Sequence, residues 1–285
     1  MNRKRILALA ALLAFCFAVP SGAEAQSRRR GGTPYAERHL TLPKRTLRFD
    51  MGPFERGIND AGILLGPYDE SAYGLRFQDY NAPDGEDDVH VLLGLGVSYG
   101  VFNNLEIGVL VVPLNFEHDQ KYGDLTPYVR WAFVDNRNFQ MGLQGTVQIP
   151  TWTDLGFGVG LPMNFNAGRI VRIEMGVELE VVFDDRDYDR PPDGEDEPRL
   201  AIDVPLALSF NIRPRGFLGA RADLLWDQIV GDYDAFRPGV GAFGGFSLFG
   251  RRATYADFTG SFMGYFKDDI INWEVVLGAT VAIGI

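Results

Sequence analysis

Charged side chains recur at every second position along several runs of small and apolar residues. Arg172 and Glu174 flank Ile173, and Arg221 and Asp223 flank Ala222. If such runs are β-strands, the charged residues share one face, because successive side chains of a strand point to opposite sides. One face of this kind could attract ions, hold water or form ion pairs. The residues assigned to it are Arg48, Asp50, Glu106, Arg130, Arg172, Glu174, Glu178, Glu180, Asp203, Arg221, Asp223, Asp257 and Glu274.

Two short motifs could carry hydrolytic chemistry, but neither has the context that it needs. Gly96-Val97-Ser98-Tyr99-Gly100 matches the GxSxG pattern, which requires a sharp turn from a strand into a helix. Ser98 lies in an alternating run with no helical pattern after it, so we expect an ordinary serine. Glu117-His118-Asp119 is expected at a solvated loop tip. We therefore predict no catalytic residue and no cofactor, and keep a hydrolase only as the weakest alternative.

The most acidic stretch of the chain, Asp184 to Arg199, resembles a calcium loop only in composition. The glycine that should follow Asp185-Arg186-Asp187-Tyr188-Asp189 is replaced by Arg190. We expect a charged, solvated loop, with a diffuse divalent-cation site bridging lipopolysaccharide phosphates as the alternative. No metal ligands are assigned.

The alternation is clearest in the last fifteen residues. From Ile271 to Ile285 every odd position is apolar, whereas the even positions are mostly small or polar. The period is two, which predicts a strand rather than a helix. Similar runs begin at Thr46 and, after the weakly patterned stretch from Pro53 to Asp88, at Val89. Within that stretch we expect only a short piece of strand around Tyr73 to Phe77.

The runs are joined by connections of two kinds. Tight turns near Asn103, Asn136, Gly168, Arg215 and Arg251 alternate with longer polar loops. Short turns at one end and long loops at the other are typical of outer-membrane barrels. Five hairpins, flanked by Thr46–Gly52 and the C-terminal strand, predict an all-β, transmembrane, antiparallel up-and-down barrel of about 12 strands. Ten or fourteen strands are the alternatives, and an even number places both termini in the periplasm.

The distribution of charge between the two faces favours a membrane barrel over a soluble one. In the strands that begin at Val89 and follow it, the outward positions carry no Asp, Glu, Lys or Arg, although 23% of the chain is charged. Charge facing lipid is costly, and so is charge buried in a small dry barrel. An apolar outer surface is consistent with lipid around the barrel. A charged inner surface is consistent with water or ion pairs within it. The rival fold is a soluble secreted sandwich or lipocalin-like barrel.

The N-terminus has the features of an export signal. Arg3, Lys4 and Arg5 precede an apolar stretch from Ile6 to Val19 and a small-residue site at Ala23-Glu24-Ala25. This predicts a signal peptide over residues 1–25, a disordered periplasmic tail over 26–43 and the barrel over 44–285. The only cysteine, Cys16, lies in the signal peptide. The net charge of −11 argues against a nucleic-acid partner.

One hairpin also carries a resemblance. Tyr99-Gly100-Val101-Phe102-Asn103-Asn104-Leu105-Glu106-Ile107-Gly108-Val109 is similar to a hairpin common in Gram-negative outer-membrane β-barrel proteins, including porin-like and transporter groups. The resemblance implies a cell outer membrane location, with lipid, lipopolysaccharide and the barrel-assembly machinery as partners. It also implies a C-terminal assembly signal, here Trp273, Ile283 and Ile285, although the last residue in that group is usually Phe.

The inner face suggests what the barrel does. Its acids outnumber its bases, and inward glycines such as Gly94, Gly96, Gly142, Gly156 and Gly160 are expected to leave space. The sequence therefore favours a narrow, passive, weakly cation-preferring channel for small polar solutes. The alternative is a closed structural or surface-binding barrel, with Pro53–Asp88 and Asp184–Arg199 making the contacts.

Overall fold

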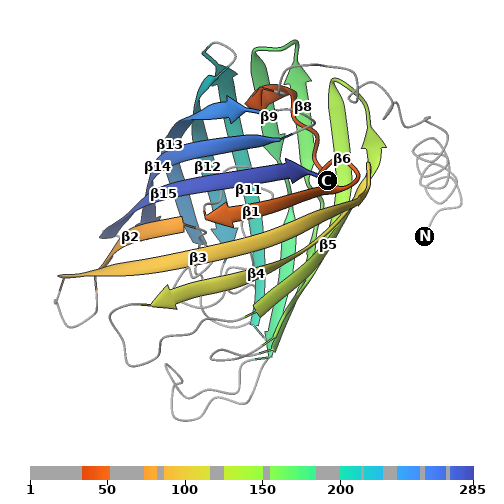
Figure 1. The fold of residues 1–285 in the computed structure, drawn as a ribbon. Helices are drawn as coiled ribbons and strands as arrows, with labels where there is room; N and C mark the ends of the chain where they lie inside the picture. Colours follow the sequence, from red (N-terminus) through yellow and green to blue (C-terminus); the bar gives the residue numbers. More distant parts are fainter. Residues whose placement is uncertain are drawn as a thin grey trace, which may run out of the picture.

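The chain folds into a single closed β-barrel (Figure 1). The computed structural model describes residues 34–51, 74–81, 87–115, 125–149, 155–183, 199–212, 215–226, 236–250, 254–267 and 270–285. Its elements in chain order are the 3-10 helix η2 (Tyr35–Glu37) and the strands β1 (Thr46–Met51), β2 (Gly74–Asn81), β3 (Asp87–Phe102), β4 (Leu105–Asn115), β5 (Leu125–Asp135), β6 (Phe139–Gln148), β7 (Leu155–Gly160), β8 (Met163–Ala167), β9 (Val171–Met175), β10 (Glu178–Phe183), β11 (Arg199–Asn211), β12 (Gly216–Trp226), β13 (Phe236–Phe249), β14 (Tyr255–Lys267) and β15 (Ile270–Gly284). Among these residues, no helix is long and apolar enough to cross a bilayer.

These segments make a barrel of 12 strands, as the sequence predicts. β7 and β8 are two halves of one strand, interrupted at Leu161 and Pro162, and β9 and β10 are likewise one strand interrupted at Gly176 and Val177. Every pairing is antiparallel, and β1 closes the ring against the C-terminal strand β15.

The first barrel strand is built from two distant pieces of sequence. β1 pairs with β15 from Ala279 to Gly284 and with β3 from Gly96 to Tyr99. β2 lies in the same gap between β15 and β3 and extends the strand that β1 begins. It pairs with β15 from Glu274 to Leu277 and with the earlier part of β3. The strand around Tyr73 to Phe77 is therefore confirmed, but as the second half of strand 1. Figure 1 shows β1 and β2 one after the other between β15 and β3.

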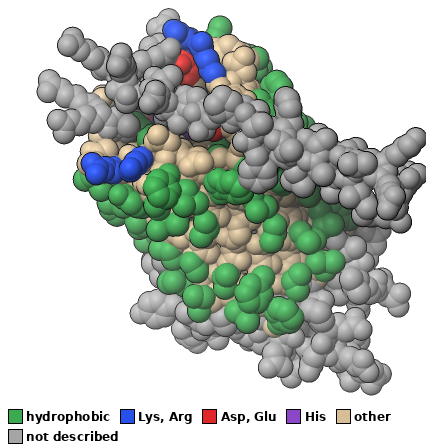
Figure 2. All heavy atoms as spheres, turned by 90° about the vertical axis from the view of Figure 1, so that its right-hand side faces the viewer, with side chains coloured by type: hydrophobic (Ala, Val, Ile, Leu, Met, Phe, Trp, Pro, Cys, Tyr) green, Lys and Arg blue, Asp and Glu red, His purple; other side chains and the backbone are tan. Residues whose placement is uncertain are grey.

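The outer surface is apolar wherever the strands expose it. Val159, Leu218 and Leu277 are each more than half exposed, and among the strand residues whose side chains the structure describes, no exposed one is charged. Figure 2 shows hydrophobic side chains spread across one outer face. This surface would be costly in water and is favourable in lipid.

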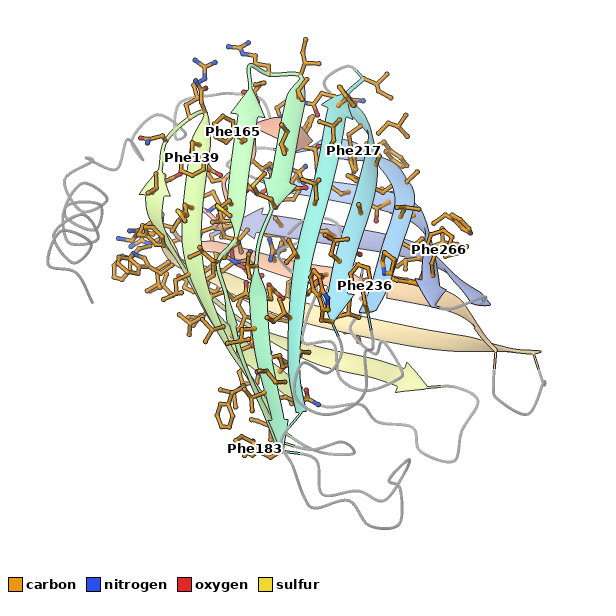
Figure 3. The ribbon with its side chains drawn as sticks, turned by 180° about the vertical axis from the view of Figure 1, so that it is seen from behind. Phe139, Phe165, Phe183, Phe217, Phe236 and Phe266 are labelled. Atoms are coloured by element: carbon orange, nitrogen blue, oxygen red, sulfur yellow. The ribbon has the colours of Figure 1, made fainter. Side chains whose placement is uncertain are left out.

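Aromatic residues mark both edges of this apolar surface. Phe139 and Phe165 pack 5.3 Å apart near the short hairpin turns, whereas Phe183, Phe236 and Phe266 lie near the ends of their strands at the opposite end (Figure 3). Aromatic girdles at the two membrane interfaces are a feature of transmembrane barrels. Their positions here indicate where the lipid headgroups lie.

Candidate functional site: the barrel interior

The interior wall carries the charged residues that the strand alternation assigned to it. Arg48, Asp50, Glu106, Arg130, Arg172, Glu174, Glu180, Asp203, Asp223 and Asp257 are buried, and Glu178 and Arg221 are half-buried. Glu274 stands opposite Met263, which is buried in the same interior, but its side chain is outside the described set. Arg213 and residues 184–198, including the acidic loop, lie outside the described residues, as do Glu117, His118 and Asp119.

Residues 34–43 also lie inside the barrel, and we call them the luminal segment. The sequence predicted that residues 26–43 form a disordered periplasmic tail, and for residues 34–43 that prediction is wrong. Tyr35, Arg38, Leu40 and Leu42 are all at most 6% exposed. The segment is polar enough to look like a solvated tail, yet its polar groups find partners on the charged wall.

A tight reversal at Arg45 directs this segment into the interior. Arg45 has a left-handed backbone with φ of 62°, a conformation that costs a non-glycine residue about 1–2 kcal/mol. Its N–H donates to Gly100 O at 2.8 Å, and its carbonyl accepts from Ile285 N–H at 2.8 Å. The reversal is thus fixed by hydrogen bonds to both β3 and the chain end.

The backbone of the luminal segment is held by side chains of the wall. Leu40 N–H donates to Gln140 Oε1 at 2.8 Å, and Leu42 N–H donates to Glu106 Oε2 at 2.9 Å. Arg172 donates to the carbonyl oxygens of Tyr35 at 3.2 Å and Arg38 at 3.0 Å. Arg130 donates to Leu40 O at 3.3 Å. These five hydrogen bonds give backbone groups of the segment partners that a strand would find in its neighbours.

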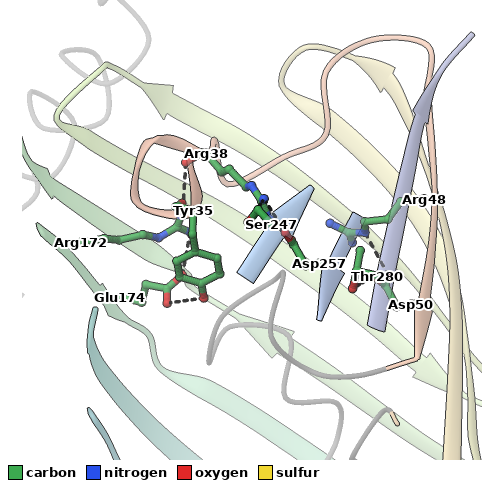
Figure 4. A network of polar contacts seen from close by, with 9 residues as sticks. All are labelled: Tyr35, Arg38, Arg48, Asp50, Arg172, Glu174, Ser247, Asp257 and Thr280. Atoms are coloured by element: carbon green, nitrogen blue, oxygen red, sulfur yellow. Dashed lines mark hydrogen bonds and ion pairs between the residues drawn. The ribbon is translucent and has the colours of Figure 1, made fainter. Parts of the chain in front are cut away.

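Tyr35 packs in an apolar cluster with Ala207, Phe217 and Phe243. Its ring stacks on Phe217 with centroids 4.3 Å apart and also contacts Phe243. Its hydroxyl donates to Glu174 Oε2 at 3.2 Å (Figure 4). Burial, reinforced by the Glu174 carboxylate, raises the pKa of Tyr35 well above its usual value, so the hydroxyl keeps its proton.

Arg38 forms the most complete polar contact of the segment. Its Nη2 lies 2.9 Å from Asp257 Oδ1 and 3.2 Å from Ser247 Oγ, while Nη1 contacts Asp257 Oδ2 (Figure 4). The guanidinium carbon lies 4.1 Å from the centroid of the Tyr255 ring. The contact therefore combines a bidentate ion pair with a cation–π interaction.

The remaining wall charges near the segment are paired with one another. Arg48 bridges Asp50 at 3.0 Å and Glu106 at 3.1 Å, and Thr280 Oγ1 donates to Asp50 at 3.0 Å. Arg172 pairs with Glu174 at 2.7 Å. Farther along the strands, Arg221 pairs with Asp223 at 2.8 Å. Glu178 stands opposite Asp203 in the same region.

The sequence suggested that inward glycines leave open space, but at several of these positions other groups occupy that space. A Cβ at Gly100 would lie 2.1 Å from Pro43 O, and a Cβ at Gly142 would lie 2.8 Å from Leu40 Cδ2. At these two positions the missing side chains make room for the luminal segment. Gly160 instead makes room for the Glu178 side chain, 3.0 Å away.

His39 of the luminal segment and Ser98 of the GxSxG pattern both have structural surroundings. His39 Nδ1 lies 2.6 Å from Asp135 Oδ1, an ion-pair geometry that holds the luminal segment near the turn between β5 and β6. Ser98 lies buried within β3, on its inner face. Within the described residues, no three His, Cys, Asp or Glu side chains are grouped to hold a metal ion.

A closed ring of strands with an apolar outer surface, aromatic edges and a charged interior defines a transmembrane antiparallel β-barrel. No family model and no curated protein matches the chain. Among solved structures it is similar to NanC porin, at 10% identity over 73% of this chain and 99% of that one, with a TM-score of 0.47. A bacterial polysaccharide outer membrane secretin matches at 11% identity over 84% and 97%, with a TM-score of 0.41. A porin matches at 12% over 75% and 68%, with a TM-score of 0.40.

Proposed function

We propose that the protein is an outer-membrane channel for small polar solutes whose periplasmic end is closed by its own luminal segment. The observation that carries this proposal is the way the interior is filled. The wall is continuous without the segment, because all its strands are paired in a closed ring. Residues 34–43 add no strand, and wall side chains such as Gln140, Glu106 and Arg172 hold their backbone in the interior.

The orientation follows from the connections. The short turns, the C-terminus and the entry of the luminal segment share one end of the barrel, and short turns are periplasmic in bacterial barrels. The exposed charges described at this end are all basic: Lys44, Arg45, Arg137, Arg169 and Arg215. They suit contact with anionic lipid headgroups, and the opposite end would face lipopolysaccharide.

Removing the luminal segment tests the channel directly. In planar bilayers, the chain starting at Lys44 should give larger conductance steps than the mature chain starting at Gln26. A truncated barrel that folds but carries no current would overturn the proposal. The acidic wall beyond the segment further predicts a reversal potential on the cation-selective side in a salt gradient.

A closed structural barrel is the second candidate, and the filled periplasmic half favours it. If the barrel is a closed structural one, the chain starting at Lys44 should also carry no current. The two candidates therefore differ in the outcome of the same recording.

A further inference from the structure

Three residues of β13 and β14 form a site that is complete on the barrel wall. Ser247 and Asp257 face each other across the two strands, and Tyr255 lies two residues before Asp257 on the same face. All three are buried. Their backbones belong to a ladder in which Gly239–Phe249 pairs with Tyr255–Tyr265, so strand pairing holds these backbones independently of Arg38.

The chemistry of this site matches a guanidinium group. The Asp257 carboxylate meets both terminal nitrogens of Arg38, Ser247 Oγ accepts a further hydrogen bond, and the Tyr255 ring covers the planar face. A guanidinium is flat and presents parallel N–H groups, so it uses all these contacts together. An ammonium group is a compact point charge, so it could form neither the bidentate pair with Asp257 nor the stacking on the Tyr255 ring.

Arg38 reaches this site as part of a tethered segment rather than as part of the wall. Its carbonyl and those of Tyr35 and Leu40 are held by Arg172 and Arg130. Such an arrangement is that of an intramolecular ligand on a receptor surface. A free solute with the same head group would find the same acceptors once the segment leaves.

We propose that the Ser247–Tyr255–Asp257 site binds guanidinium-bearing solutes, and that this is the solute class that the channel takes. The inference rests on the proposed channel function, because passage requires that the luminal segment vacate the site. Bound solute then competes with Arg38 for Asp257, which favours the open barrel.

The test uses the chain starting at Lys44, with folding checked by circular dichroism, and arginine amide as the probe. Calorimetry in detergent should show saturable binding, and the same probe should reduce the bilayer current in a saturable way. Lysine amide should bind at least about tenfold more weakly, because it lacks the planar fork. Asp257→Asn should abolish arginine amide binding, whereas Asp223→Asn, which removes an inner acid paired with Arg221, should keep it.

The outcomes separate this inference from the channel proposal. Current through the truncated barrel without any binding or block by arginine amide overturns the guanidinium site and leaves the channel. Binding heat without current overturns the channel and leaves the site. Equal binding of arginine amide and lysine amide overturns the guanidinium site. If Asp257→Asn does not fold, Tyr255→Leu decides, since loss of the ring should weaken arginine amide severalfold more than lysine amide.

Discussion

Arg38 and Asp257 lie 219 positions apart in the sequence and form a bidentate ion pair inside the barrel. Their side chains are only 7% and 2% exposed. This pair ties a segment that precedes the first strand to the wall near the connection between β13 and β14. Both side chains are buried. Removing either partner would therefore leave the other as a buried, unpaired charge, which is energetically costly.

Replacing Arg38 with Ala should therefore release the luminal segment. Breaking a buried pair by removing one partner costs about 3–5 kcal/mol, because the other charge stays buried. We expect a higher single-channel conductance and faster proteolysis of the N-terminal segment. Both can be measured on protein folded into lipid vesicles.

Arg169→Ala is the matched control for this change. Arg169 lies 3.8 Å from Glu37 of the same segment, but its side chain is 61% exposed. Exposed ion pairs contribute about 0–1 kcal/mol. Conductance and proteolysis should remain close to wild type, and an effect as large as that of Arg38→Ala would refute the role given to the buried pair.

Gly100→Ala should displace the luminal segment by steric conflict. The new Cβ would meet backbone oxygens of Pro43 and Leu42 at 2.1 and 2.8 Å, and backbone atoms cannot rotate away as a side chain can. We expect destabilisation of about 1–3 kcal/mol, measured by urea unfolding in vesicles. Gly145→Ala is the control, since its Cβ would meet nothing within 4 Å.

Closure by the luminal segment should weaken at high pH. The docked Tyr35 has a raised pKa, whereas a released tyrosine has a pKa of about 10. Closure is then fully favoured below pH of about 10 and is lost as the pH rises through the raised value. Conductance should increase in this range.

Tyr35→Phe isolates this effect, because phenylalanine keeps the ring stacking on Phe217 but cannot ionise. The variant should lack the alkaline rise while other groups of the barrel still titrate. If wild type and variant show the same pH profile, Tyr35 is not the group responsible.

Charge placed on the outer surface should cost most at mid-strand. Leu277, in the middle of β15, is 52% exposed, and Leu277→Arg should destabilise the barrel in vesicles by about 2–4 kcal/mol. Ile170 is 61% exposed at a hairpin turn, where Ile170→Arg should cost only about 0–1 kcal/mol. Equal costs at both sites would contradict the placement of the membrane.

The prediction of a C-terminal assembly signal can be tested at Ile285. Ile285 is 73% exposed next to the reversal at Arg45. Ile285→Phe should leave outer-membrane yield unchanged or raise it, as quantified in isolated outer membranes. A lower yield would argue against recognition of Trp273, Ile283 and Ile285 by the assembly machinery.

The sequence by itself determined the barrel and the division of its faces. A period of two is a local property of strands, so the pattern from Ile271 to Ile285 was enough to separate outward Leu277 from inward Thr280. The same rule assigned Glu106, Glu174 and Asp257 to one face. Turn residues such as Asn103 and Gly168 separated neighbouring strands, which allowed the number of strands to be predicted.

Only the tertiary structure decided what fills the barrel. The conformation of the luminal segment is set by contacts with β4, β6, β9 and β14 rather than by a periodic pattern in its own sequence. The pairing of Arg38 with Asp257, and of Leu42 with Glu106, depends on ring closure, which brings distant strands around one axis. Composition alone therefore indicated a solvated tail, and the closed ring supplied the partners that hold it inside.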